Sequence, residues 1–332
     1  MKKNRLSQLG LASLLALAGM GAHAQSNVSL YGLADLSVGR TQAPGGQSTN
    51  SVDSGKMSTS YWGIGGKEDL GGGLSAVFKF EQFVRMNTGA MGRFDGDTAF
   101  SRTSSVGLSS ASLGTVTFGR NSTPLFVSTL LFNAFGDSFG YSPSIRHYFS
   151  SGTVTGDTGW NQSVMYASPT FSGFRFGAIA AFKTGDAATD GKNWGLNFSY
   201  GNGPIAASLV FQDVKKDSAV AALDDTRTVQ LGASYDFGAA KAFAQLGSID
   251  NKTKDVGYDI AGLGVRVPLG AGAAIAQWSR IAPDVGSDRN TLSVGYLHTL
   301  SKRTELYAVA MSDKIDNLGT GKSYSLGIRH KF

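Results

Sequence analysis

Apolar and polar residues alternate with a period of two along most of this chain. In the segment 226–237, Val229 and Leu231 fall on one side of an extended backbone, and Thr228 and Gln230 fall on the other. Successive side chains of a β-strand point to opposite faces, so this alternation is typical of a strand with one apolar and one polar face. The same pattern recurs to the end of the chain.

The alternation predicts about sixteen strands. We place them near residues 27–40, 57–68, 73–86, 100–110, 114–121, 161–168, 173–184, 192–201, 204–214, 226–237, 239–250, 255–267, 271–281, 288–299, 303–313 and 322–332. A helical period is expected only in the N-terminal segment and in part of 123–140.

The predicted connections alternate between short turns and longer polar loops, of which 122–160 is the longest. This is the arrangement of an up-and-down antiparallel barrel whose two ends differ. About sixteen strands with their apolar faces inward would enclose a space that their side chains could not fill. With the apolar face toward lipid, water fills the lumen and closure satisfies every backbone hydrogen bond. The pattern therefore predicts an all-β transmembrane barrel.

The N-terminus carries an export signal. Residues 1–24 combine three basic residues, a short apolar run and the sequence Ala22-His23-Ala24, which is typical of a cleaved signal peptide. We expect a mature barrel domain over 25–332. Loss of the three basic residues lowers the formal net charge from +6 to +3, and no basic cluster remains for nucleic acid. The chain has no cysteine.

Several stretches, in order, carry a resemblance to a known family. They are NVSLYGLADLSVG (27–39), SYWGIGGKEDLGGGLSAVFKFE (60–81), SVGLSSASLGTVTFGRNSTP (105–124), NQSVMYASPTFSGFRFGA (161–178) and the terminal YSLGIRHKF. The chain resembles the general trimeric porins of the Gram-negative outer membrane, of the betaproteobacterial type.

The resemblance implies a homotrimer of sixteen-stranded barrels in contact with outer-membrane lipid and lipopolysaccharide. It implies that the third long loop folds into the lumen and narrows a water-filled channel for small hydrophilic solutes and ions. It also implies recognition of the chain by the outer-membrane assembly machinery, for which the terminal Phe332 would serve as a signal. No cofactor or metal is expected.

Strand parity selects candidate pore-lining residues, because a charge facing lipid near the midplane costs about 2–4 kcal/mol for Arg or Lys. Lys79, Glu81, Asp35 and Arg175 fall on polar faces. Selection of solutes in a pore depends on such charges and on its diameter.

Two further arginines match the family but share parity with apolar residues. Arg102 aligns with Val106, and Arg120 aligns with Phe118. We expect a bulge, or the bend into the long loop near Gly119, to turn both side chains toward water.

The long loop is poor in acids. It carries Asp137 and Asp157 but also Arg146, and Tyr61 stands where the family usually has a wall arginine. A weak preference for anions is expected. The loop is also rich in aromatic residues, which either pack it against the wall or form a stacking track for particular solutes.

Three other functions remain to be weighed against passive diffusion. A substrate-selective channel for sugars or aromatic acids would show saturable currents. A structural or adhesin barrel would have a plugged lumen. A barrel enzyme has little support, because no nucleophile motif occurs and only His147, His298 and His330 remain after signal removal.

Overall fold

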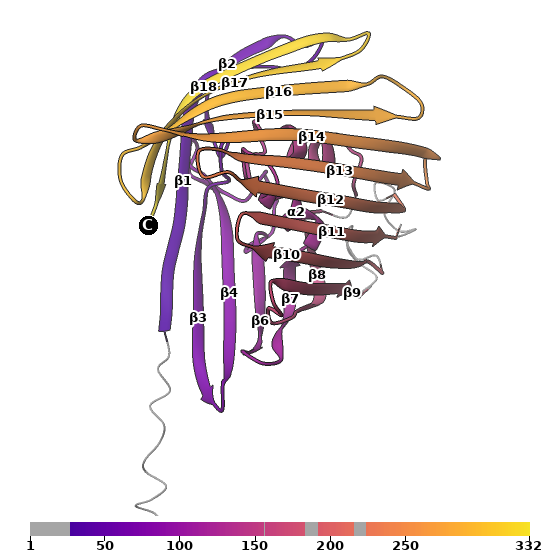
Figure 1. The fold of residues 1–332 in the computed structure, drawn as a ribbon. Helices are drawn as coiled ribbons and strands as arrows, with labels where there is room; N and C mark the ends of the chain where they lie inside the picture. The colour runs from indigo at the N-terminus through magenta and orange to yellow at the C-terminus, as the bar shows by residue number, and fades with distance from the viewer. Residues whose placement is uncertain (1–26, 156, 183–191, 216–223) are drawn as a thin grey trace, which may run out of the picture.

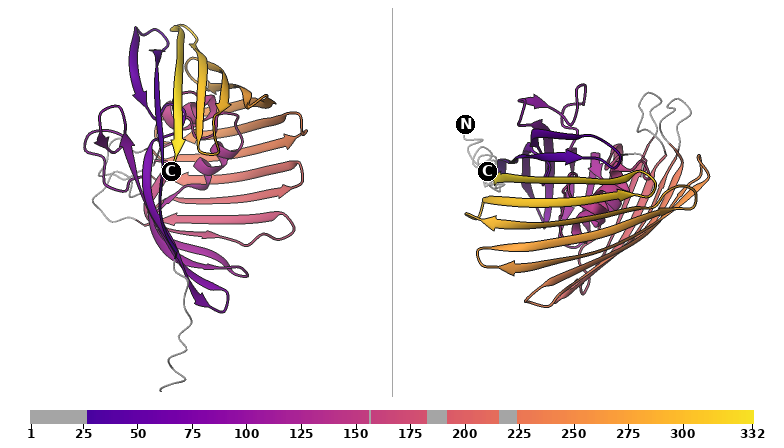
Figure 2. Two further views of the ribbon diagram at one scale, coloured as in Figure 1. Left: turned by 90° about the vertical axis from the view of Figure 1, so that its left-hand side faces the viewer. Right: turned by 90° about the horizontal axis from the view of Figure 1, so that it is seen from above.

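The computed structural model describes residues 27–155, 157–182, 192–215 and 224–332 of the chain. The predicted signal peptide, residues 1–24, lies outside the described residues. Sixteen of the described strands form one antiparallel sheet in which each of the sixteen pairs with the next, and the first strand pairs with the last (Figures 1 and 2). The chain is therefore a closed sixteen-stranded β-barrel, as the alternation predicts.

The barrel strands follow the predicted order. They are β1 (Asn27–Gln42), β3 (Tyr61–Gly71), β4 (Leu74–Arg85), β6 (Thr103–Ser110), β7 (Gly114–Ser122), β8 (Gly159–Ala167), β9 (Phe174–Ala181), β10 (Trp194–Asn202), β11 (Ile205–Val214), β12 (Thr226–Asp236), β13 (Lys241–Asn251), β14 (Val256–Leu269), β15 (Gly272–Pro283), β16 (Arg289–Thr299), β17 (Thr304–Ile315) and β18 (Gly319–Lys331). Two short strands, β2 (Ser48–Ser54) and β5 (Ala90–Met91), lie in the longer connections.

Strand β2 corrects one prediction, because residues 41–56 were expected to form a loop. It pairs with the second half of β1, from Leu36 to Gln42, and the first half of β1 pairs with β3. Val52 is the only large apolar residue of β2, so the sequence offered no alternation to indicate a strand there. Backbone pairing with β1, rather than an apolar face, holds this segment in place.

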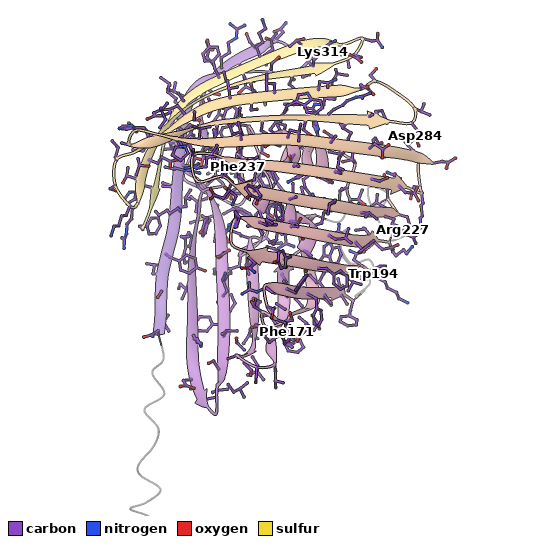
Figure 3. The ribbon with its side chains drawn as sticks, in the orientation of Figure 1. Phe171, Trp194, Arg227, Phe237, Asp284 and Lys314 are labelled. Atoms are coloured by element: carbon purple, nitrogen blue, oxygen red, sulfur yellow. The ribbon has the colours of Figure 1, made fainter. Side chains whose placement is uncertain are left out.

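The two faces of the sheet differ as the period of two requires. The outer face carries exposed apolar side chains, among them Val28, Leu30, Val106, Phe118, Phe176, Phe198, Leu231, Leu246, Leu263, Leu292 and Leu326. The inner face carries buried polar side chains, among them Gln212, Gln230, Gln245, Gln277, Ser279, Thr291, Ser293 and Ser325. Figure 3 shows Arg227 and Asp284 at the loop end of the strands, whereas Phe237 lies at the turn end.

The segment 123–158, called loop 3 here, enters the barrel and contains its helices: α2 (Pro124–Leu131), α3 (Pro143–Ile145) and the single-turn π-helix η1 (Arg146–Ser150). Thr123 begins α2 because its hydroxyl accepts a hydrogen bond from the Phe126 N–H at 3.2 Å, and Pro124 occupies the first turn. In the part of the chain that the structure describes, no helix is long and apolar enough to cross a membrane.

The C-terminal strand closes the barrel. Strand β18 pairs with β1 from Tyr324 opposite Arg40 to Lys331 opposite Leu33. Phe332 extends the pairing, because its N–H donates to the Gly32 carbonyl at 3.1 Å and its carbonyl accepts from the Gly32 N–H at 3.2 Å. Its ring lies against Gly32, where a side chain would collide with it.

Candidate pore constriction

Loop 3 is attached to the inner wall by polar contacts on one of its sides. The Gln230 and Gln245 side chains of β12 and β13 donate to the Thr129 hydroxyl and carbonyl, both at 3.0 Å. Farther along, Gln277 of β15 accepts from the Ala134 N–H at 3.0 Å, and Tyr141 donates to Ser325 of β18 at 2.7 Å. These bonds give partners to buried amide nitrogens of Gln230 and Gln245, to the Gln277 amide oxygen and to the Ser325 hydroxyl.

Aromatic residues on the same side of loop 3 occupy spaces above wall glycines, called sockets here, where a side chain on the glycine would collide with the ring. Phe132 lies over Gly232, and the Tyr148 hydroxyl lies over Gly247, so closely that an added Cβ would be 1.8 Å from that oxygen. Phe135 is only 2% exposed and packs in a cluster with wall residues of β13, β15, β16 and β17. The absence of a side chain on these glycines brings the loop close to the wall.

The opposite side of loop 3 borders a cavity of about 500 Å³. The loop contributes mostly apolar lining residues, namely Phe126, Val127, Leu130, Phe139, Phe149 and Val154, together with Asp157 and Thr158. The other wall contributes Glu81, Phe83 and Arg85 of β4 together with Arg93 and Arg102. The cavity therefore has an apolar side and a side rich in arginine.

Arg102 lies at the centre of the basic side, and the structure places it in the lumen. Its Nε is 3.1 Å from a Glu81 carboxylate oxygen, and one of its terminal nitrogens donates to the Thr59 hydroxyl at 3.0 Å. The guanidinium carbon stands 4.1 Å from the centre of the Tyr61 ring, which is a cation–π contact. Strand β6 begins only at Thr103, so strand parity does not constrain Arg102.

Glu81 and Lys79 project from β4 on the lumen side, as their parity predicts. Glu81 is buried and lines the cavity, where it accepts a hydrogen bond from the Tyr31 hydroxyl at 2.9 Å. The Lys79 ammonium is 3.8 Å from the same Glu81 oxygen, and the Lys79 side chain is about half exposed. Glu81 thus offsets part of the positive charge of Arg102 and Lys79.

Two lining arginines were not among the predicted site residues. Arg85 shares the lumen parity of Glu81 on β4, so its position could have been read from the alternation. Arg93 lies in the connection between β4 and β6, where no alternation indicates orientation. Its guanidinium contacts the Asp97 carboxylate at 3.0 Å and the Asp157 carboxylate of loop 3 at 3.0 Å.

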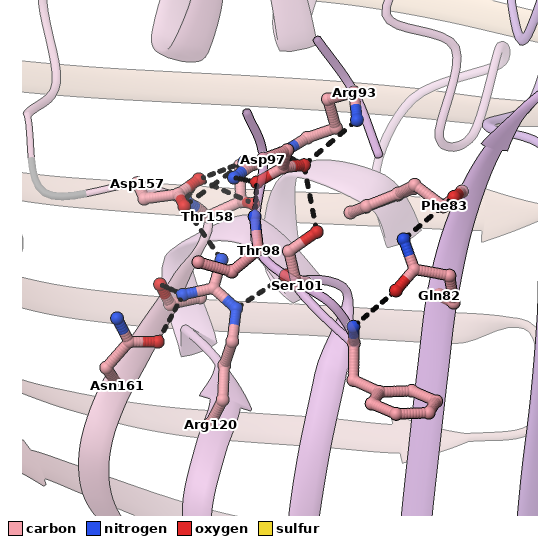
Figure 4. Close-up of polar contacts among 12 residues, drawn as sticks. Gln82, Phe83, Arg93, Asp97, Thr98, Ser101, Arg120, Asp157, Thr158 and Asn161 are labelled. Atoms are coloured by element: carbon pink, nitrogen blue, oxygen red, sulfur yellow. Dashed lines mark hydrogen bonds and ion pairs between the residues drawn. The ribbon is translucent and has the colours of Figure 1, made fainter. Parts of the chain in front are cut away.

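Arg120 takes part in the same network from below, as Figure 4 shows. It contacts Asp157 at 2.7 Å and donates to the Asn161 amide oxygen and to the Ser101 and Gly159 carbonyls. The pairing of β7 with β8 shifts between Gly119 and Asn121, and Gly119 has a φ of +124°, so a bulge redirects the chain there. Arg120 is largely buried and supports Asp157 rather than lining the cavity.

The acids of this network are ionised. Burial alone would raise the pKa of Asp97, but the hydrogen bonds from Arg93 and Ser101 outweigh it and lower the pKa to about 2. Burial likewise opposes the ionisation of Asp157, but the charges of Arg93 and Arg120 lower its pKa. Of the charged residues that line the cavity, three are arginines and two are acids, Glu81 and Asp157.

The other predicted site residues lie away from the cavity lining. Asp35 is fully buried under the break between β2 and β3, where it accepts from the Met57 and Ser58 N–H groups and from the Tyr307 hydroxyl at 2.6 Å. Asp137, at the tip of loop 3, accepts from the Ser58 hydroxyl at 2.8 Å. Asp35 holds backbone segments together and is shielded from the channel water, whereas Asp137 is only half-buried and ties loop 3 to Ser58.

Arg146 and Arg175 also have other positions. Arg146 reaches Asp313 of β17 at 3.0 Å and ties loop 3 to the wall. Arg175 is exposed beside the short turn before β9, where it donates to the Thr170 hydroxyl. It lies at the turn-end rim of the barrel and does not line the cavity.

His147 is fully buried between loop 3 and the wall, with its ring nitrogens 3.1 Å from the Ser279 hydroxyl and 2.9 Å from the Thr291 hydroxyl. Burial and the nearby Arg289 charge lower its pKa to about 3, so the ring is neutral near pH 7. Within the described ranges, no group of three or more His, Cys, Asp or Glu side chains could hold a metal ion.

Comparison with known proteins matches residues 10–318 to the family model described as Gram-negative porin. The chain is 35% identical over 317 residues to outer membrane porin protein 32 of Delftia acidovorans, across 90% of this chain and 87% of that protein. The chain is a Gram-negative porin.

Further relatives agree with this assignment. The porin is 30% identical to an outer membrane porin protein of Bordetella pertussis over the whole of both chains. It superposes on the structure described as an anion-selective porin from Comamonas acidovorans with a TM-score of 0.81, 28% identity and coverage of 93% of this chain and 100% of that one. Its place is therefore the outer membrane of a Gram-negative cell, where its barrel forms a channel.

Proposed function

We propose that this porin lets small hydrophilic solutes and ions diffuse passively, with a weak preference for anions. The observation that carries the preference is the charge of the cavity lining, in which Arg85, Arg93 and Arg102 face Glu81 and Asp157. The anion selectivity named for the Comamonas acidovorans structure supports the same sign.

The preference is weak because each lining arginine has an acidic neighbour. Arg102 pairs with Glu81, Arg93 pairs with two carboxylates, and Arg85 pairs with the exposed Asp95. Two opposite charges that lie close together largely cancel each other, so the electrostatic field that a passing ion experiences is small. Lys79 beside Glu81 and Arg120 beside Asp157 raise the basic groups of this network to five, against four acids. The one positive charge left over attracts anions without excluding cations.

The test is the reversal potential of single channels in planar bilayers under a potassium chloride gradient. We expect the sign of the reversal potential to show that chloride is more permeant than potassium. Arg102→Gln and Arg85→Gln should each reduce the magnitude of this potential. Arg175→Gln removes the same charge at the rim and should change it less. A potential of the opposite sign would contradict the anion preference, and the absence of conductance steps would contradict the channel itself and favour a structural barrel.

We also propose that the chain transports without catalysing a reaction. His147, Ser279, Thr291 and Asp313 form a hydrogen-bonded series that superficially resembles a catalytic relay. All four side chains are completely buried, so a substrate has no access to them. A turnover assay on lipid and peptide substrates tests this proposal, and measurable turnover would overturn it.

The assembly of the porin is proposed to be a homotrimer in contact with lipid and lipopolysaccharide, as the sequence resemblance implies. Mass determination of the native protein in detergent would test it, because a monomer mass contradicts the trimer.

Phe332 is proposed to be read by the outer-membrane assembly machinery. It is 47% exposed on the outer face and adds one pair of backbone hydrogen bonds to a strand pairing that already spans eight residue pairs. Deletion of Phe332 should therefore reduce the amount of inserted porin far more than the conductance of channels that do form. Normal insertion of the deletion variant in cells would contradict the proposal.

A further inference from the structure

We propose that the narrow part of the lumen contains a binding subsite for small aromatic monocarboxylates. The proposal rests on the channel function above and names a solute class for it. The supporting observation is that two different surfaces line one cavity. The guanidinium groups of Arg85 and Arg102 lie on the wall, and the aromatic rings of loop 3 lie on the other side.

The helix α2 faces the lumen with its apolar side, which is the reverse of the usual arrangement. Its polar residues Ser128 and Thr129 are buried toward the wall, whereas Val127 is 37% exposed and lines the cavity. Apolar side chains left in contact with water lose the stabilisation that burial provides. The exposed apolar side of α2 therefore has no structural explanation in the contacts of loop 3 with the wall.

Three phenylalanines extend this apolar side. The Phe126 and Phe149 rings meet edge to face with centres 5.4 Å apart, and the Phe139 ring lies 5.9 Å from Phe126. Phe139 and Phe149 are half-buried and line the cavity, in contrast with Phe135, which the wall covers. An aromatic solute could add to this cluster in the same edge or offset geometry.

The opposite wall offers the complement for a carboxylate. Arg102 stacks on Tyr61 while its Nε faces Glu81 and one terminal nitrogen donates to Thr59, so its other terminal nitrogen is the donor that a solute carboxylate would meet. Arg85 approaches the cavity from the next part of the wall. A solute lying across the cavity would place its carboxylate against these arginines and its ring against Phe139 and Phe149.

The two surfaces also limit the solute class. Phe126, Phe139 and Phe149 carry no charged or hydrogen-bonding group, and the nearest polar lining residues of loop 3 are Asp157 and Thr158. A second carboxylate would meet either these rings, where it loses its hydration without a partner, or the negative charge of Asp157. An aliphatic acid as small as acetate would reach the arginines but not the rings. The cavity volume, about 500 Å³, lies within the range of sites that hold small molecules, about 300–1,000 Å³.

The test measures how benzoate reduces the chloride current through single channels of the full porin, compared with acetate and with neutral benzamide. We expect the concentration of benzoate that halves the current to be about ten times lower than the half-blocking concentration of acetate or of benzamide. Phe139→Leu and Phe149→Leu keep an apolar side chain and should each raise the half-blocking concentration of benzoate about two- to tenfold. Arg102→Gln should raise it as well.

The controls make the same kinds of change elsewhere. Leu131→Ala trims an exposed apolar residue of α2 outside the cavity lining, and Arg175→Gln removes a rim charge; both should leave the block by benzoate unchanged. The chloride current of each variant reports that its channel is assembled. Equal block by benzoate and acetate, or leucine variants that behave as wild type, would overturn the subsite while leaving the porin function intact. A channel without chloride current would instead contradict the proposed function.

Discussion

The two sides of loop 3 use the same residue types for opposite purposes. On the wall side, Phe132, Phe135 and Tyr148 are buried over glycines or within an apolar cluster. On the lumen side, Phe126, Phe139 and Phe149 pack on one another and border the cavity. Aromatic content alone therefore does not assign a role; the surface opposite each ring does. The wall-side rings show the packing against the wall that the sequence allows, and the stacking role that we propose falls to the lumen-side rings.

The two sides should differ most in their contribution to stability. Phe135→Ala opens a cavity in the cluster that fixes loop 3 and should cost about 3–5 kcal/mol of folding free energy. Phe139→Ala removes a ring that already borders water and should cost no more than about 1–2 kcal/mol. Unfolding of both variants in detergent, followed by tryptophan fluorescence, measures the difference. Equal losses would show that the two sides are packed alike.

A glycine substitution tests the sockets. Gly247→Ala places a methyl group against the buried Tyr148 hydroxyl, and such overpacking should cost about 1–3 kcal/mol and displace loop 3. Gly201→Ala is the matched control, because an added Cβ at that barrel position meets open space. Single-channel conductance should change in the first variant and not in the second. An unchanged conductance in both would show that the sockets do not position the loop.

The pH dependence tests His147, which the wall side holds in its neutral form. Its pKa in the folded protein is about 3, below the ordinary value of 6.5, so between these pH values only the unfolded chain binds the proton. The porin should therefore lose stability as the pH falls from about 6.5 toward 3, by up to about 1.4 kcal/mol per pH unit from this residue. His147→Gln should reduce that slope, and an unchanged slope would contradict the assignment.

Much of the barrel could be predicted because lipid and water impose opposite demands on alternate residues. That constraint identified the strands and the lumen positions of Lys79 and Glu81. The constraint from lipid and water is lost wherever a residue lies outside the regular pairing of the strands. The bulge at Gly119 and the start of β6 free Arg120 and Arg102 from strand parity, so their different environments followed from local contacts and not from the alternation.

The remaining features depend on contacts between distant segments. Asp35 is buried because Tyr307, far away in the sequence, and the break at 55–60 cover it, and no local pattern contains that information. Arg93 joins the constriction through Asp157 of loop 3. Which aromatic rings of loop 3 pack against the wall depends on which wall positions are glycine, as at Gly232 and Gly247. These positions can be identified only once the pairing register of the strands is known.

The most direct test of the two sides of loop 3 measures whether channel water reaches the ring positions. Because the chain contains no cysteine, an introduced cysteine is the only thiol that a reagent can modify. Phe139→Cys and Phe135→Cys would each be treated with a water-soluble thiol reagent while single-channel current is recorded. We predict rapid modification and a fall in current at position 139, and no modification at position 135 until the porin is unfolded. Equal rates at the two positions, or faster reaction at 135, would contradict the assignment of one side to the wall and the other to the lumen.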